Sequence, residues 1–183
     1  MRYKFILLIA TTFIGCTTIP DGYVKDSGGE TIYKNVDLFR GATYYRHVHF
    51  FDFRSRPLEL FYVTADGKAG IFSTYRYVYN APIYLNKITI IDGTGRNKAE
   101  LPVNPSDVLI KYSPQYEEYA TEALPDAGAL ILYKIFKSGK ASIRFSGRNG
   151  YHDVELEDET LKVNLDILEK YFKIQEIDYS AFK

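Results

Sequence analysis

The sequence predicts an α+β fold, in which a tyrosine-rich antiparallel sheet is combined with two helices in the C-terminal half. The 183 residues include 17 tyrosines and no tryptophan, and tyrosine favours strands. β-Branched and aromatic runs separated by turn residues fill the first half, whereas capping residues or helical spacing of apolar residues favour helices in two stretches after residue 125. The tyrosines could instead form an exposed aromatic binding surface, and this alternative stays open.

Five runs in the first half predict strands, because they are rich in β-branched and aromatic residues. Asp66-Gly67, between the third and fourth runs, accepts the positive φ angles of a tight hairpin turn. Asp92-Gly93 is a second turn and closes the fifth run. With the first turn, one face of its hairpin holds Leu58, Leu60 and Tyr62 beside Ile71, Ser73 and Tyr75. The five runs are residues 31–39, 43–53, 57–63, 70–79 and 83–93.

Two helices are expected after residue 125. Residues 126–140 fit a helix or a buried strand by periodicity alone. Asp126 as N-cap, Gly139 at the C′ position and three lysines near the end favour the helix. A second helix is expected to begin near Asp158, because an apolar stripe follows at helical spacing, formed by Leu161, Leu165, Leu168 and Phe172.

Residues 141–157, between the two helices, predict a hairpin with Asn149-Gly150 as its two-residue turn. Apolar and polar residues alternate along both strands, so one face is buried and the other is wet. The apolar face is expected to pack against Leu161, Leu165 and Leu168 of the second helix. The expected facing pairs are Ile143–Leu156 and Phe145–Val154 on the buried side, and Arg144–Glu155 and Ser146–Asp153 on the wet side.

The N-terminus has the pattern of a bacterial lipoprotein signal. Arg2 and Lys4 precede an apolar run of 11 residues, Phe5 to Gly15, which is too short to span a bilayer. Gly15-Cys16 resembles the end of a lipobox, and Cys16 is the only cysteine. The resemblance implies that Cys16 carries a diacylglycerol and an amide-linked acyl chain such as palmitate, and stable anchoring requires at least two chains. An ordinary signal peptide with a chance cysteine is the alternative.

The remaining chain is expected to hold a tether at residues 16–29 and one α+β domain at residues 30–183, after a signal peptide at residues 1–15. Removal of the signal takes away two of 23 basic side chains and none of 23 acidic ones, which leaves a net charge of −2. No basic field is available to attract nucleic acid. Thr17 after the cysteine favours sorting to the outer membrane of a diderm cell, by resemblance to enterobacterial lipoproteins.

Residues 75–173 resemble a family of uncharacterised bacterial lipoprotein and periplasmic domains. The resemblance rests on four segments, in order "YRYVYNAPIYLNKITIIDG", "ALILYKIFKSGK", "IRFSGRNGYHDV" and "LEKYF". A tryptophan common in the family is absent where Ile83-Tyr84-Leu85 stands. The resemblance implies the domain layout and a cell-envelope setting. It implies no catalytic or binding residue.

His47 and His49 are the pair of candidate metal ligands that the sequence suggests. The run "HVH" would place both imidazoles on one strand face, where they could bind zinc or copper. A third ligand would have to come from His152 or from a carboxylate such as Asp52 or Asp92. Ordinary strand residues are the simpler interpretation, and no cofactor is predicted.

Other side chains with chemical potential have simpler explanations. No Gly-x-Ser-x-Gly elbow or phosphate loop is present. The carboxylates at 153, 155 and 157 share a strand face and suggest acid–base catalysis, but cross-strand pairing on a solvated face explains them. Arginines scattered through the tyrosine-rich half could contribute to a binding face; they are Arg40, Arg46, Arg54, Arg56 and Arg76.

Two functions from different classes follow. The first is a membrane-anchored lipoprotein that binds or scaffolds envelope components, without catalysis, with membrane lipid, envelope protein or glycan as partners. The alternative is an envelope hydrolase or metal-dependent enzyme with an unrecognised site. The metal content of the purified protein would separate the two.

Overall fold

The computed structural model describes residues 19–27, 31–51 and 56–180. Its strands form two antiparallel sheets, and both α-helices lie in the C-terminal half, which confirms the predicted α+β fold. The larger sheet has seven strands in the order β1-β2-β3-β4-β5-β9-β8. These strands are β1 (Tyr23–Lys25), β2 (Ile32–Asp37), β3 (Ala42–His47), β4 (Leu58–Ala65), β5 (Lys68–Tyr79), β8 (Leu109–Tyr112) and β9 (Tyr116–Leu124).

The smaller sheet has four strands in the order β11-β10-β6-β7. They are β6 (Leu85–Asp92), β7 (Lys98–Pro102), β10 (Ala141–Gly147) and β11 (Gly150–Glu155). The helices are α1 (Asp126–Lys137) and α2 (Asp158–Ile174), and two short 3₁₀ turns cover Val48–Phe51 and Pro105–Asp107. None of the helices in the described part of the chain is both long and apolar enough to cross a bilayer.

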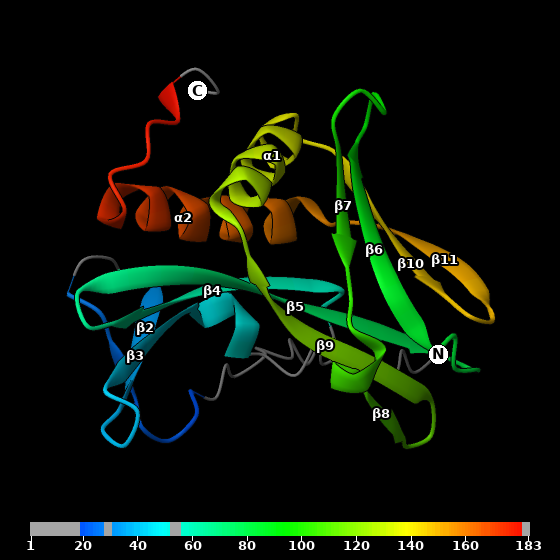
Figure 1. The fold of residues 1–183 in the computed structure, drawn as a ribbon, viewed down its shortest axis with the longest axis horizontal. Helices are drawn as coiled ribbons and strands as arrows, with labels where there is room; N and C mark the ends of the chain where they lie inside the picture. Colours follow the sequence, from blue (N-terminus) through cyan, green and yellow to red (C-terminus); the bar gives the residue numbers. More distant parts are fainter. Residues whose placement is uncertain (1–18, 28–30, 52–55, 181–183) are drawn as a thin grey trace, which may run out of the picture.

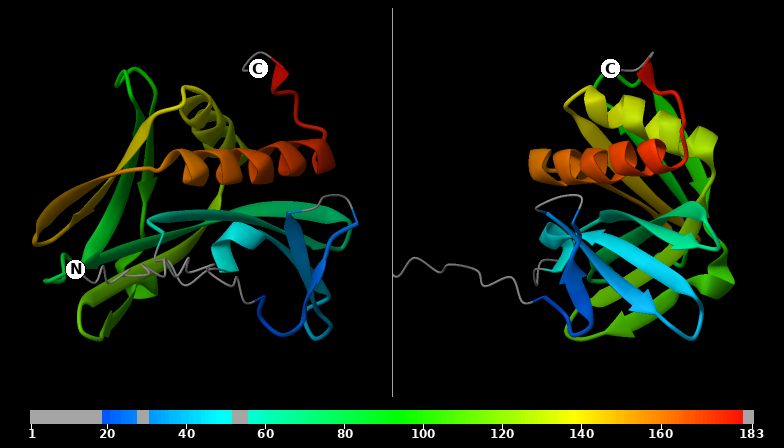
Figure 2. Two further views of the ribbon diagram at one scale, coloured as in Figure 1. Left: turned by 180° about the vertical axis from the view of Figure 1, so that it is seen from behind. Right: turned by 90° about the vertical axis from the view of Figure 1, so that its left-hand side faces the viewer.

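The helices lie on one side of the seven-stranded sheet, and the four-stranded sheet rises beside them (Figures 1 and 2). α2 packs chiefly against β4, whereas α1 packs against α2, β6 and β7. The buried Asn164 fixes α2 on β4: its Oδ1 accepts from the Leu60 amide at 2.8 Å, and its Nδ2 donates to the Thr160 carbonyl at 3.0 Å.

A single apolar core joins both sheets and both helices. Tyr77 of β5 contacts Phe145 of β10, with ring centroids 5.6 Å apart, and Tyr133 of α1 contacts Phe172 of α2 at 5.7 Å. Three tyrosines of the first half are therefore core residues, which fits the strand interpretation. Tyr62, Tyr75 and Tyr77 are buried.

The β4–β5 hairpin has the predicted register and face. Asp66 and Gly67 both have positive φ, of 51° and 72°, which suits the right-handed twist of the two strands. The predicted cross-strand neighbours are the observed pairs Leu58–Tyr75, Leu60–Ser73 and Tyr62–Ile71.

The β10–β11 hairpin differs from its predicted register by two residues. Its turn is Arg148-Asn149, and Gly147 pairs with Gly150, so Arg144 faces Asp153 and Phe145 faces His152. A shift of two keeps every side chain on its predicted face, and Phe145, Ile143 and Leu156 are buried. The predicted packing of this hairpin against the second helix is also wrong, because α2 packs mainly on the larger sheet and α1 covers the smaller one.

The new register follows from contacts that the tip of this hairpin makes with the segment before β6. The Asn149 amide donates to the Ile83 carbonyl at 3.0 Å, and its Nδ2 donates to the Pro82 carbonyl at 3.2 Å. A Cβ atom on Gly147 would lie 2.2 Å from the Ile83 carbonyl oxygen. Only glycine therefore fits where β10 passes this segment.

Four further boundaries correct the sequence interpretation. β1, inside the predicted tether, pairs with β2, so the folded domain begins before residue 30. β3 ends at His47, and the next residues form a 3₁₀ turn. Pro125 is the N-cap of α1 and Asp126 is its first residue, whereas Gly139, at φ 77°, follows the helix as predicted. β7, β8 and β9 were not predicted as strands.

Candidate functional site

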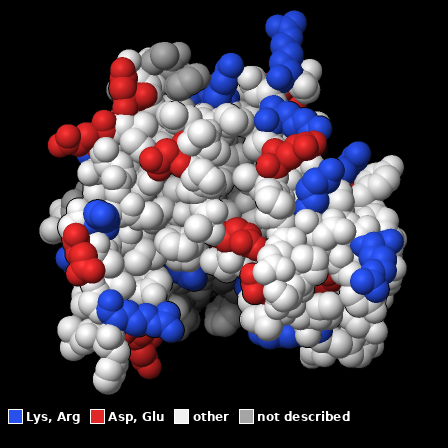
Figure 3. Space-filling model, viewed as in Figure 1, with Lys and Arg blue, Asp and Glu red and all other residues white. Residues whose placement is uncertain are grey.

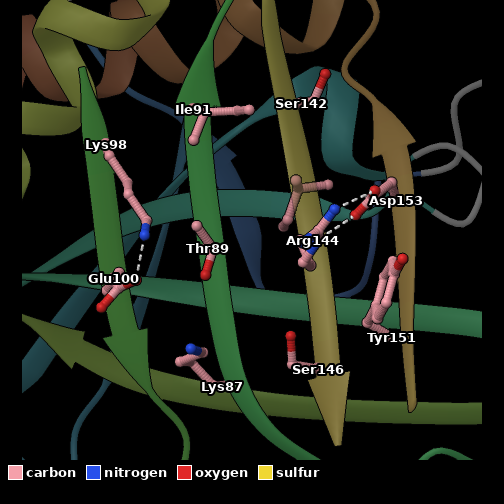
Figure 4. Close-up of a pocket in the computed structure, with 11 residues that line it drawn as sticks. Lys87, Thr89, Ile91, Lys98, Glu100, Ser142, Arg144, Ser146, Tyr151 and Asp153 are labelled. Atoms are coloured by element: carbon pink, nitrogen blue, oxygen red, sulfur yellow. Dashed lines mark hydrogen bonds and ion pairs between the residues drawn. The ribbon is translucent and has the colours of Figure 1, made fainter. Parts of the chain in front are cut away.

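The outer face of the four-stranded sheet holds a hollow of about 520 Å³. Side chains from all four strands point into it (Figure 4). The opposite face of the same strands packs into the core, because inward and outward residues alternate. The hollow is lined by Lys98 and Glu100 of β7, Lys87, Thr89 and Ile91 of β6, Ser142, Arg144 and Ser146 of β10, and Tyr151 and Asp153 of β11.

Ion pairs fix the charged groups on both sides of the hollow. Arg144 binds Asp153 through two hydrogen bonds, from Nε to Oδ1 at 2.6 Å and from Nη2 to Oδ2 at 2.7 Å. Across the sheet, Lys98 Nζ lies 2.5 Å from Glu100 Oε1. Lys87 adds a third cation, so three basic and two acidic side chains line the hollow.

Both carboxyl groups of the hollow are held in the ionised form. The hydrogen bond from Arg144 lowers the pKa of Asp153, and the hydrogen bond from Lys98 lowers the pKa of Glu100. A general acid at neutral pH needs the opposite shift, towards a pKa near 7. The pair therefore suits binding better than acid–base catalysis.

Tyr151 gives the hollow an aromatic wall. The Arg144 guanidinium lies 4.3 Å from the centroid of its ring, in cation–π geometry. The same guanidinium is held by Asp153, so the three side chains form one connected cluster. Tyr151 is 65% exposed, which leaves much of its ring available to a ligand. The Thr89 and Ser146 hydroxyl groups lie between this cluster and Lys87, and Ser142 lies at the other end of the hollow, near Ile91 (Figure 4).

A buried carboxylate holds the segment that leads into β6. Glu118 of β9 is fully buried and accepts hydrogen bonds from the amides of Ile83, Tyr84 and Leu85, at 2.5, 3.1 and 2.7 Å. Tyr84 has a positive φ of 57°. Three amide donors compensate the buried charge, and the same segment receives the tip of the β10–β11 hairpin. Glu118 thus connects the larger sheet to the strands of the hollow.

The three carboxylates singled out in the sequence have different environments. Asp153 lines the hollow, paired with Arg144 in place of the expected Glu155. Glu155 lies opposite Ser142 on the cross-strand ladder. Glu157 is the N-cap residue of α2, and its carboxylate lies 3.8 Å from Arg56. The three therefore form no common catalytic set.

His47 and His49 are neighbours, but they do not share a strand face. The His49 amide donates to His47 Nδ1 at 3.1 Å, and the two ring centroids are 6.3 Å apart. Each ring approaches a different carboxylate of α2: His49 Nδ1 lies 2.7 Å from Glu159, and His47 Nε2 lies 4.0 Å from Asp166. Burial, with the nearby His49, Lys170 and Lys162, lowers the pKa of His47 to about 4.

The proposed third metal ligands lie elsewhere or outside the described residues. His152 packs against Tyr79, with ring centroids 4.8 Å apart. Asp92 accepts hydrogen bonds from Thr94, Arg96 and Asn97 within its own turn. Asp52 is outside the described residues. Across residues 19–27, 31–51 and 56–180, no three His, Cys, Asp or Glu side chains are grouped so as to hold a metal ion.

Three of the five arginines singled out in the sequence converge on a second, smaller hollow. Arg46, Arg56 and Arg76 line a space of about 90 Å³ together with Glu59. Each has a carboxylate partner: Arg46–Glu59 at 3.3 Å, Arg76–Glu117 at 2.9 Å and Arg56–Glu157 at 3.8 Å. Arg40 instead lies on the exposed β2–β3 turn, and Arg54 is outside the described residues.

The chemistry at Cys16 also lies outside the described residues, so its lipidation stays a prediction. Neither a family model, nor a curated protein, nor a solved structure matches the chain.

Proposed function

We propose that this protein is a membrane-anchored envelope lipoprotein that binds a glycan of the cell envelope, without catalysis, in the hollow of the four-stranded sheet. The anchor rests on the pattern of residues 1–16, in which a short apolar run ends at Gly15-Cys16. Outer-membrane placement rests on Thr17. The binding site rests on the composition of the hollow.

The observation that supports a glycan is the combination of an exposed aromatic ring with fixed polar groups. A sugar presents hydroxyl groups around its ring and apolar C–H groups on its faces. Tyr151 offers a surface for a sugar face. Asp153 and Glu100 can accept from sugar hydroxyls, and Arg144 and Lys87 can donate to them. Since ion pairs already position Arg144, Asp153 and Glu100, binding does not have to order these three side chains.

The glycan proposal is tested by titrating the full chain, in detergent, with soluble fragments of peptidoglycan and of lipopolysaccharide core. Tyr151→Ala should weaken binding about tenfold, because the aromatic wall is lost. Tyr112→Ala is the matched control, since Tyr112 is an exposed tyrosine on β8, outside the hollow. Absence of saturable binding, or equal weakening by the two substitutions, would refute the proposal.

The anchor is tested separately by Cys16→Ser. The substituted protein should incorporate no labelled palmitate, and it should leave the membrane fraction or retain its signal peptide. Identical labelling and fractionation of the two proteins would contradict the anchor. The alternative of a metal-dependent enzyme predicts stoichiometric metal in the purified chain, which elemental analysis measures directly.

A further inference from the structure

The turn between β2 and β3 exposes two large apolar side chains at its tip. Leu38 is 86% exposed and Phe39 is 104% exposed. The turn that presents them is ordered by Asp37, whose Oδ1 accepts from the amides of Phe39 and Arg40, at 3.0 and 3.1 Å. Arg40 is exposed beside them and lies 3.7 Å from Asp37.

Two further apolar side chains are exposed on the strands near the tip. Val24 and Val36 are both more than half exposed. Val24 pairs with Lys34, which shares a strand face with Val36, so the two valines lie on one face. Figure 3 shows an uncharged projection at the lower left of the molecule, beside basic and acidic side chains. Such exposed apolar side chains mark contact with another phase or molecule.

The chain enters the domain at the same end of the sheet. Tyr23, the first residue of β1, pairs with Asn35, two residues before the strand end at Asp37. A Cβ on Gly22 would touch the Asn35 side chain at 2.7 Å, so Gly22 also lies at this end. Cys16 is six residues before Gly22, a span of at most about 20 Å of chain. The tip and the chain entry both lie along the lower edge of the molecule in all three ribbon views (Figures 1 and 2).

We infer that the β2–β3 turn inserts Leu38 and Phe39 into the surface of the bilayer that holds the lipid anchor. The inference rests on the proposed lipidation of Cys16. Leucine and phenylalanine enter the boundary between head groups and acyl chains, and the Arg40 side chain reaches lipid phosphates from that depth. The lipid anchor and the inserted turn are two contacts at one end of the domain, and together they orient it. The hollow of the other sheet therefore has a fixed orientation relative to the membrane.

A tryptophan reporter tests the inference, because the chain has no tryptophan of its own. Phe39→Trp is placed in the full lipidated chain and reconstituted into phosphatidylethanolamine–phosphatidylglycerol vesicles with and without brominated acyl chains. Emission should shift to the blue in vesicles and be strongly quenched by bromine. Ile131→Trp is the control: Ile131 is partly exposed on α1, on the upper side of the ribbon views, and its emission should not change.

Each of the other possible results contradicts the insertion of the turn. If mass spectrometry shows acylated Cys16 and the protein floats with vesicles, but Phe39→Trp is not quenched, the anchor stands and the insertion is wrong. A blue shift without bromine quenching means that a protein or a second copy covers the turn, which also refutes insertion. Equal quenching of both variants excludes a fixed orientation. If Cys16 carries no acyl chain, the anchor and the insertion fall together.

Discussion

The buried carboxylate of Glu118 joins the two sheets. It accepts three hydrogen bonds from backbone amides, and this set of donors requires a carboxylate. We predict that Glu118→Gln lowers the free energy of unfolding by about 2–4 kcal/mol, because a glutamine amide group would face backbone donors. Urea denaturation measures this. Glu117→Gln is the matched control, because it removes only the partly exposed pair with Arg76 and should cost less than about 1 kcal/mol. Similar losses in both variants would contradict the role of Glu118.

His47 gives the domain a second residue-scale property, a sensitivity to acid. Its pKa of about 4 in the folded state lies below the ordinary 6.5, so the unfolded chain binds a proton that the folded chain does not between these values. Stability should therefore fall as the pH drops below about 6.5, by about 2–3 kcal/mol from this residue, and the loss should level off below the folded-state pKa of about 4.

The substitution His47→Gln should reduce the slope of the unfolding free energy against pH. The reduction corresponds to at most one proton bound on unfolding. Denaturation midpoints at intervals between pH 7 and 4, for the parent and the variant, measure it. If both proteins lose stability equally across this window, His47 is not the group responsible.

At the scale of elements, local sequence predicted the register of one hairpin correctly and that of another wrongly. The β4–β5 register followed from Asp66-Gly67 because both residues accept positive φ, and a Cβ on Gly67 would meet nothing within 4 Å. The β10–β11 register did not, because its tip binds the Pro82–Tyr84 segment, which is distant in the sequence. An Asn-Gly pair predicts a turn, but it carries no information about such a partner.

The candidate site was missed for a related reason. Asp153 and Arg144 were recognised as polar residues of a wet strand face, but β7 was not predicted, and Lys98 and Glu100 belong to it. β9 was not predicted as a strand because of its glutamates, one of which is the buried Glu118. The prediction that His47 and His49 share one strand face is wrong, because the His49 amide donates to the His47 ring and the chain turns there. Side-chain alternation predicts which residues share one face of a strand. The order of the strands in the sheet determines which residues of different strands lie together.

Gly147 tests the contact that determines the β10–β11 register. Gly147→Ala should cost about 2–4 kcal/mol, because its Cβ would overlap the Ile83 carbonyl and the backbone must move. Gly70→Ala is the control within a strand, since its Cβ would meet only the Phe72 ring at 3.5 Å. That change should be neutral or slightly stabilising. Equal thermal midpoints for the two variants would show that the tip does not depend on the glycine.

At the scale of the whole molecule, the arrangement of helices determines how the domain unfolds. α1 covers the smaller sheet, α2 covers the larger one, and the helices pack on each other. Tyr77 and Phe145 also join the sheets directly. Neither sheet has a complete core without the other, so the described part of the chain should unfold as one unit.

Substitutions in the two sheets test this cooperativity. Leu60→Ala in β4 and Phe145→Ala in β10 each remove a fully buried side chain and should cost about 2–5 and 3–5 kcal/mol. Each should move one common transition, measured together by circular dichroism and by tyrosine fluorescence in urea. If Phe145→Ala instead separates the two signals into an early and a late step, the four-stranded sheet with its hollow is an independent unit. The shared core would then not be what holds the site in place.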